Sequence, residues 1–132
     1  MIARNLLFVA AALAALVAPA RAHHSFAAEF DANQPVTIRG TLTKLDWVNP
    51  HGWIFLDVKT ATGAVESWEI ETAGPTQLMR RGMRKNDFPV GVEVIITGFR
   101  SRKNPFVAAA RSVKRPDGTE FFMSSQETGA PN

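Results

Sequence analysis

The chain has 132 residues, of which 15 are Lys or Arg and 12 are Asp or Glu, and it contains no cysteine. Disulfide frameworks, cysteine-based metal sites and thiol redox chemistry are therefore excluded. The formal net charge of +3 includes Arg4 and Arg21, and without these two the balance is 13 basic against 12 acidic residues, or +1. Such a balance does not indicate a protein that binds nucleic acid through its overall charge.

Residues 1–22 have the pattern of a cleaved secretory signal peptide. Arg4 gives the positive start, residues 6–17 form the apolar run, and Ala20-Arg21-Ala22 is a small-residue cleavage site. The apolar run is shorter than the ~20 residues that span a bilayer. We therefore expect export to the periplasm, a mature chain that begins at His23, and no transmembrane segment or lipoprotein anchor after cleavage.

Cleavage would leave 110 residues, which is the size of one domain. Residues 23–34 carry two aromatic side chains, Phe26 and Phe30, and we expect an ordered arm that these two residues hold in place. A barrel domain is expected over residues 35–123. The polar stretch over residues 124–132 predicts a disordered tail.

Alternating apolar residues predict a series of short strands separated by turns. The expected strands cover residues 35–47, with a bulge or bend near Gly40, and then 53–59, 65–71, 92–99, 106–113 and 120–123. A single short helix is expected over residues 74–82. Pro75 suits its first turn and Gly82 its end, with Leu78 and Met79 facing the core.

Three strands, one helix and then two strands are the element order of the OB-fold, a five-stranded Greek-key barrel. A lipocalin-like barrel or a simple sandwich would not place a single helix between the third and fourth strands. The predicted fold class is therefore all-β with one short helix, an OB-like Greek-key barrel of five to six strands.

The three histidines, His23, His24 and His51, form the sharpest candidate site. A histidine at the mature N-terminus offers its α-amine and its imidazole Nδ1 to one ion, and both lose their protons at little cost near neutral pH. Copper(II) favours nitrogen ligands in tetragonal geometry. We expect a three-nitrogen copper site from His23 and His51, with His24 as an alternative or additional ligand. The competing interpretation is an exposed terminus and an ordinary turn histidine.

A second candidate is an aromatic ligand face around the turn at residues 49–52. Trp47 and Trp53 flank this turn, Asn49 lies within it, and Trp68 is expected on the third strand with its side chain inward. Tryptophans beside polar groups can bind a glycan, a peptide or a protein partner. The alternative is that Trp47 or Trp53 closes one end of the barrel.

Several segments of the chain resemble an uncharacterised family of small exported bacterial proteins, the domain of unknown function 6152. They are residues 23–26, 31–40, 47–51, 68–71 and 74–81. The resemblance implies export, and the two histidine elements of the family fall on His23, His24 and His51. Many relatives have alanine after the last of these histidines, whereas this chain has Gly52, which is expected to loosen the turn. The resemblance supplies no reaction.

Three groups of basic residues are interpreted as a solvated surface paired with nearby glutamates, because an exported protein rarely meets nucleic acid. They are Arg80, Arg81, Arg84 and Lys85; Arg100, Arg102 and Lys103; and Arg111, Lys114 and Arg115. Anionic lipid or acidic glycan of the envelope is the alternative use. No catalytic triad or nucleotide motif is present. Glu69 and Glu71 are interpreted as the wet face of a strand. We expect a binding protein rather than an enzyme, with a copper-dependent oxidase as the remaining alternative.

Overall fold

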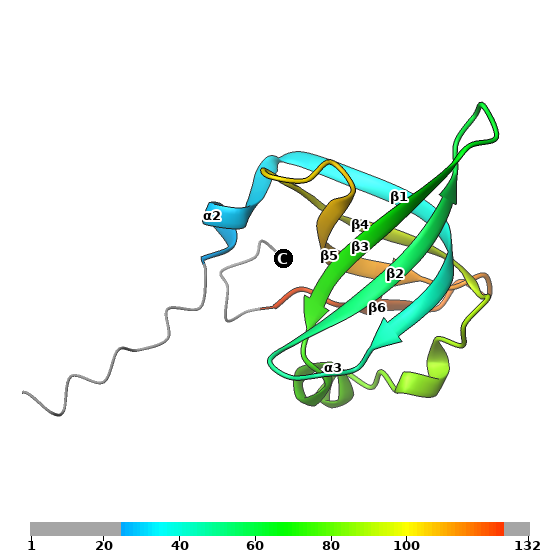
Figure 1. Ribbon diagram of the computed structural model, residues 1–132. Helices are drawn as coiled ribbons and strands as arrows, with labels where there is room; N and C mark the ends of the chain where they lie inside the picture. Colours follow the sequence, from blue (N-terminus) through cyan, green and yellow to red (C-terminus); the bar gives the residue numbers. More distant parts are fainter. Residues whose placement is uncertain (1–24, 126–132) are drawn as a thin grey trace, which may run out of the picture.

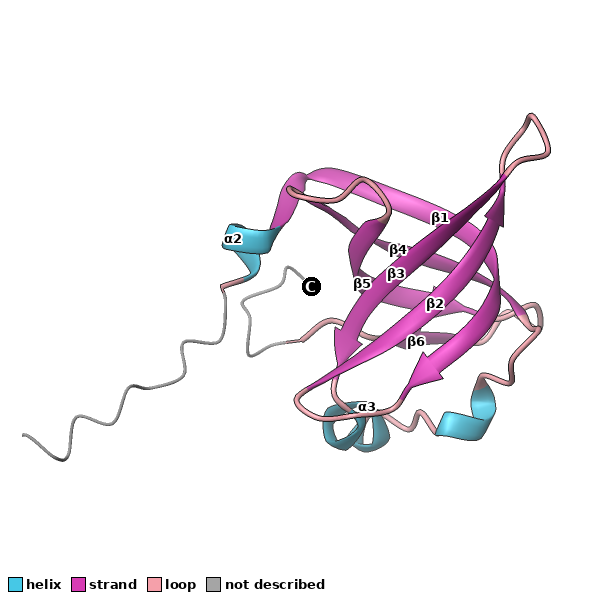
Figure 2. Ribbon diagram, in the orientation of Figure 1, coloured by secondary structure: helices cyan, strands magenta, loops and turns pink. Residues whose placement is uncertain are grey.

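In the computed structural model, which describes residues 25–125, six strands form one sheet that curves into a barrel (Figures 1 and 2). The elements follow one another as α2 (Phe26–Glu29), β1 (Phe30–Asp46), β2 (His51–Lys59), β3 (Val65–Ala73), α3 (Pro75–Arg80), the 3-10 helix η1 (Lys85–Asp87), β4 (Glu93–Ser101), β5 (Val107–Lys114) and β6 (Glu120–Phe122). Figure 1 shows α3 at one end of the barrel and α2 outside it, beside the start of β1.

The strand pairings confirm the predicted OB-like topology. The order in the sheet is β3-β2-β1-β4-β5-β6, and a parallel pairing between β3 and β5 closes the ring. The five strands that make the ring, with α3 between β3 and β4, have the arrangement of an OB-fold. The sixth strand pairs with β5 at residues 112–114, beyond the part of β5 that pairs with β3.

Strand β1 is longer than predicted because it serves two neighbours. Its 17 residues begin at Phe30 rather than at residue 35, and it pairs first with β4 and then with β2. Its pairing is irregular at two places, between Phe30 and Pro35 against β4 and between Leu42 and Lys44 against β2, and the bend that the sequence predicts near Gly40 lies at neither. Gly40 instead allows β2 to approach closely, because a Cβ there would lie 2.9 Å from the Asp57 carbonyl oxygen.

The interior of the barrel follows the predicted alternation. Ile54 and Leu56 on β2, Ile70 on β3 and Ile96 on β4 are all buried. Burying an aliphatic side chain of this size stabilises the fold by ~1.5–3 kcal/mol. Residues between them on these three strands point away from the core. On β5, by contrast, Ala108, Ala109 and Ala110 are all buried, because Ala109 is covered from outside the barrel by Phe26 and Phe30.

Helix α3 lies where the sequence predicts. Of the two residues expected to face the core, however, only one is buried. Pro75 begins the helix, Gly82 follows it with a φ of 87°, and Leu78 is buried. Met79 is 43 % exposed, whereas Met83 is fully buried. A helix of six residues buries a narrow side, and Met83 returns to that side because its N–H donates to the Leu78 carbonyl at 3.1 Å.

The ordered chain extends past the predicted end of the barrel. The Met123 carbonyl accepts a 2.8 Å hydrogen bond from the Ala73 N–H, which joins the end of β3 to the segment after β6. Ser124 and Ser125 are buried, so the tail expected to be disordered from residue 124 is packed at its first two residues. Residues 126–132 lie outside the described part. No helix within residues 25–125 is long and apolar enough to cross a membrane.

Candidate metal site at the start of strand β2

The turn before β2 is fixed against the N-terminus of α3. The Asn49 side-chain oxygen accepts a 3.4 Å hydrogen bond from the Thr76 N–H. Gly74 packs so closely against the Pro50 carbonyl that no Cβ would fit there. Gly52 is buried within β2, and a Cβ on it would lie 2.7 Å from the Thr72 hydroxyl. The glycine after His51 therefore permits close packing against β3, which differs from the loosening that the sequence suggested.

His51 is the first residue of β2, and its imidazole meets a carboxylate of β3. Its Nδ1 lies 3.2 Å from Glu71 Oε1, with the two side chains 20 % and 12 % exposed. The register brings them together, because His51 pairs with Ala73 and Glu71 lies two residues before Ala73 on the same face of β3. The contact satisfies the distance for an ion pair but is not a well-aligned hydrogen bond.

Glu71 lies in an unusual electrostatic environment for a strand carboxylate. Burial is the main cause that raises its pKa from 4.5 to about 7, and the negative charge of Glu29 adds to it. Desolvation disfavours the charged carboxylate, and a neighbouring like charge acts in the same direction. Glu71 is therefore not the wet face of a strand that the sequence suggested, and it can hold or release a proton near neutral pH.

Glu29 belongs to the arm, and aromatic packing fixes the arm on the outside of the barrel. Phe26 and Phe30 are buried, as predicted, and they form a separate cluster with Ala109 of β5. The Phe26 ring stands edge-on to that of Phe99, with the ring centres 5.5 Å apart. Since Ala109 pairs with Glu71 across the parallel β3–β5 junction, the arm and the His51 contact share one side of the barrel.

Arg102 provides a second anchor for the arm, which sequence reasoning missed. Its N–H donates to the Glu29 carbonyl at 2.9 Å, and its Nε donates to the Ala27 carbonyl at 3.1 Å. Its guanidinium also lies 3.2 Å from Asp31. The sequence placed Arg102 in a solvated basic group, and nothing local in the sequence signals that this loop residue reaches the arm 71 positions away.

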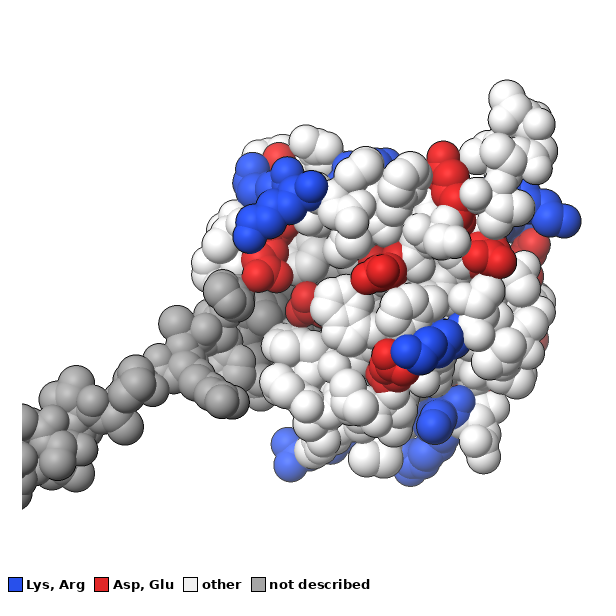
Figure 3. All heavy atoms as spheres, in the orientation of Figure 1, with Lys and Arg blue, Asp and Glu red and all other residues white. Residues whose placement is uncertain are grey.

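Other arginines of the three basic groups also bind parts of the fold rather than the glutamates expected for them. Arg81 donates to the Ser124 carbonyl at 2.8 Å, and Arg100 donates to the Pro105 carbonyl at 2.6 Å. Arg115 lies 2.6 Å from Asp117. Figure 3 shows separate groups of basic side chains on the visible face, with acidic side chains near them. This face does not present a continuous basic area.

The predicted ligand face does not come together as one surface. Trp53 points out from β2, half-buried, and Trp47 after β1 packs partly against the core. Trp68 is 6 % exposed inside the barrel, where its Nε1 donates to Glu66 and the Arg100 guanidinium lies over its ring. Asn49 is exposed and takes part in the α3 contact. The strict alternation of β3 puts Trp68 on the opposite face from the outward-pointing residues.

Of the three predicted metal ligands, only one lies within the described residues. His51 is positioned beside Glu71, whereas His23 and His24 lie outside the described residues. Within residues 25–125, no three His, Asp or Glu side chains form a group that could hold a metal ion. A metal at His51 would therefore need ligands from beyond this part of the chain.

The fold and this site define an OB-like barrel with a histidine–carboxylate contact on its outer side, next to an anchored N-terminal arm. The sequence matches the family of unknown function DUF6152 over residues 11–108, and the protein belongs to that family. No curated protein matches the chain.

A solved structure with a similar fold is the dimeric structure of the N-terminal domain of PriB protein from Thermoanaerobacter tencongensis. It has 22 % sequence identity and a TM-score of 0.49, and the match covers 63 % of this chain and 96 % of that one. This likeness concerns the fold and says nothing of function.

Proposed function

We propose that the protein is an exported periplasmic protein that binds or carries copper(II) through His51 and the N-terminal histidine of the cleaved chain. The observation that carries the proposal is the 3.2 Å distance between His51 Nδ1 and Glu71 Oε1. Metal-binding histidines commonly place their second ring nitrogen against a carboxylate, which fixes the tautomer and the ring orientation. A proton on Nδ1, facing Glu71, would leave Nε2 with the lone pair that a metal ligand needs.

The anchored arm supports the participation of His23 and His24. The arm packs beside β5 through Phe26, and the charge of Glu29 acts on Glu71. His24 directly precedes Ser25, the first described residue, and two extended residues span at most ~7 Å. A cleaved chain that begins at His23 would thus carry its α-amine and imidazole on a short tether from this side of the barrel.

The donor set suits copper(II) for chemical reasons. Two imidazoles and an amine are the nitrogen donors that copper(II) prefers in tetragonal geometry. The carboxylates of Glu71 and Glu29 would offset part of the positive charge of the ion. When bound, copper would be held by nitrogen ligands, while Glu71 positions the His51 ring.

The test uses the untagged protein exported and processed by a bacterial host, titrated with copper(II) by calorimetry and weighed by native mass spectrometry. We expect a mass that begins at His23 and retains one copper ion. Glu71→Gln should weaken copper binding ~10–100-fold, the usual effect of removing such a carboxylate partner. His51→Ala should weaken it further, and Lys59→Gln, an exposed lysine on the same strand, should leave it unchanged. Processed protein that ignores copper would overturn the proposal.

A second candidate function is a metal-free module that binds a glycan, peptide or protein of the cell envelope. The observation that favours it is that Trp53 and Phe55 both point outward from β2 and are only partly buried. Aromatic side chains in this position offer apolar contact area to a partner. Under this function Trp53→Ala would abolish partner binding and His51→Ala would preserve it, the reverse of the copper titration.

A further inference from the structure

The barrel wall is incomplete at the end away from α3, where the first part of β1 and the β2–β3 hairpin lie (Figure 1). Residues 35–39 of β1 pair with β4 only, because pairing with β2 begins at Thr41, opposite Asp57. Val58 and Lys59, which follow Asp57, pair only with β3. An open pocket of about 330 Å³ lies here, and its volume is within the ~300–1,000 Å³ typical of sites for small ligands.

Two opposite charges lie beside Trp68 in this pocket. Glu66 and Arg100 both line it, and the alternation of β3 and β4 turns both side chains toward the inner face of the barrel. The Trp68 Nε1–H donates to Glu66 Oε2 at 3.1 Å, and the carbon of the Arg100 guanidinium lies 5.1 Å from the centre of the Trp68 ring. Val36 and Val58 add apolar surface to the lining.

Neither of these charges is neutralised by an opposite charge within residues 25–125. Arg100 donates to the Pro105 carbonyl at 2.6 Å but forms no ion pair, and Glu66 uses one carboxylate oxygen for Trp68. Glu66 and Arg100 share the pocket without pairing with each other. Each therefore has hydrogen-bonding capacity that the described part of the fold does not use, and the two groups are complementary to a ligand with both charges.

The edge of β1 that faces the pocket adds backbone groups. Alternate residues of an antiparallel strand direct their N–H and C=O groups to opposite sides. Residues 35–39 bond to β4 on one side, and no other backbone hydrogen bond within the described chain uses them. A short strand edge of this kind can accept an extended peptide as an added strand.

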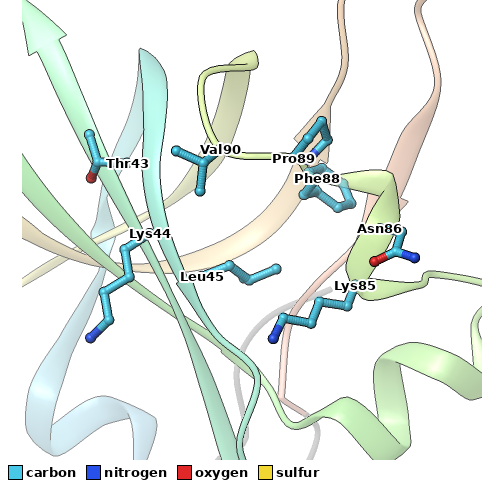
Figure 4. A pocket seen from close by; sticks show the side chains of 8 residues that line it. All are labelled: Thr43, Lys44, Leu45, Lys85, Asn86, Phe88, Pro89 and Val90. Atoms are coloured by element: carbon cyan, nitrogen blue, oxygen red, sulfur yellow. The ribbon is translucent and has the colours of Figure 1, made fainter.

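A larger depression, shown in Figure 4, lies toward the other end of β1 and lacks this combination. Leu45 and Val90 give it apolar walls, but no acidic residue lines it. The Lys44 amine is directed to Asp46 and to the Phe55 ring on the outer face of the sheet. The pocket beside Trp68 is therefore the one that offers a ligand two opposite charges.

We propose that the pocket beside Trp68 binds the zwitterion of an apolar dipeptide. Its carboxylate would meet the guanidinium of Arg100, its ammonium group would meet Glu66, and its amide would lie along the edge of β1. Two extended residues span at most ~7 Å, so a dipeptide can bridge two groups that do not touch each other. Arginine is suited to a carboxylate, and the two charges together select a zwitterion. The proposal is independent of copper binding and of the outer face of β2, because it rests on inward-facing residues.

The experiment is a calorimetric titration of the exported, processed protein with leucyl-leucine at pH 7. Glu66→Gln keeps an acceptor for Trp68 but removes the charge, and it should weaken binding about tenfold, the effect of losing one charge-assisted hydrogen bond. Arg100→Gln should weaken binding by a similar factor. The matched controls are Glu69→Gln and Arg111→Gln, which change exposed side chains on β3 and β5 and should leave binding unchanged.

Blocked peptides test each charge in the wild-type protein, without any substitution. N-acetyl-leucyl-leucine lacks the ammonium group and leucyl-leucine amide lacks the carboxylate, and each should bind about tenfold more weakly than leucyl-leucine. The penalty for acetylation should disappear in Glu66→Gln, and the penalty for amidation should disappear in Arg100→Gln. Absence of leucyl-leucine binding, equal affinity for free and blocked peptides, or equal losses in Glu66→Gln and Glu69→Gln would each overturn the proposal.

Discussion

The two faces of β3 show how differently one strand serves the fold and the candidate site. On the inner face Trp68 and Ile70 are buried in the hydrophobic core, and the sequence pattern alone places them there. On the outer face Glu71 is also largely covered, where its carboxylate meets His51 and feels the negative charge of Glu29 in the arm. Burial inside the barrel stabilises the fold, whereas burial outside it perturbs an ionisable group. Adjacent residues of β3 therefore have different roles: Ile70 stabilises the core, and Glu71 takes part in the candidate site.

The largest expected effect on stability comes from truncating a buried side chain on the inner face of β3. Ile70 is fully buried, and Ile70→Ala should lower the free energy of unfolding by ~2–5 kcal/mol through lost burial and a cavity. Its outward neighbour Glu69 is exposed, and Glu69→Ala should change stability by less than ~0.5 kcal/mol. Urea denaturation of both variants measures the difference. Equal losses would show that the two faces of β3 are not distinct.

The burial of Glu71 on the outer face should make the stability of the protein depend on pH. The pKa of Glu71 is raised from 4.5 to about 7, so the folded state binds a proton more tightly than the unfolded state. The contribution of Glu71 to the free energy of unfolding is therefore fully present below pH 4.5 and is lost as the pH rises toward 7, by up to about 3 kcal/mol. Glu71→Gln should remove this slope in thermal or urea unfolding between pH 4.5 and 7, and Glu69→Gln should retain it. A slope that persists in Glu71→Gln would contradict the account.

A smaller effect, confined to the arm, is expected when the contacts of Arg102 with the arm are removed. Arg102→Ala removes the Nε bond to Ala27 and the contact with Asp31, a loss of about 1 kcal/mol. Amide hydrogen exchange over residues 26–30 should become about fivefold faster, while exchange in the interior of β3 stays unchanged. Arg39→Ala, which removes an exposed pair with Glu93, is the control and should leave the arm unaffected. If hydrogen exchange over residues 26–30 is unchanged in Arg102→Ala, then Arg102 does not anchor the arm.

The contrast between the core and the outer surface also explains how much the sequence could predict. Period-two alternation identified the core strands, and the helix between the third and fourth strands indicated the OB-like order. The burial of Phe26 and Phe30 agrees with their expected role in holding residues 23–34, although residues 30–34 belong to β1. The contact between His51 and Glu71 depends on strand register, and the bulge after Leu42 and the anchoring by Arg102 depend on tertiary packing. Met79 was misplaced because a six-residue helix buries fewer positions than its pattern suggests.

The most direct measurement is the electron paramagnetic resonance spectrum of the processed protein loaded with one equivalent of copper(II), recorded for wild type and His51→Ala. The account predicts a tetragonal spectrum with hyperfine coupling to three nitrogens in wild type, and the loss of one of these nitrogens in His51→Ala. Identical spectra for the two proteins would contradict the role of His51 as a ligand and leave the copper at the N-terminus alone.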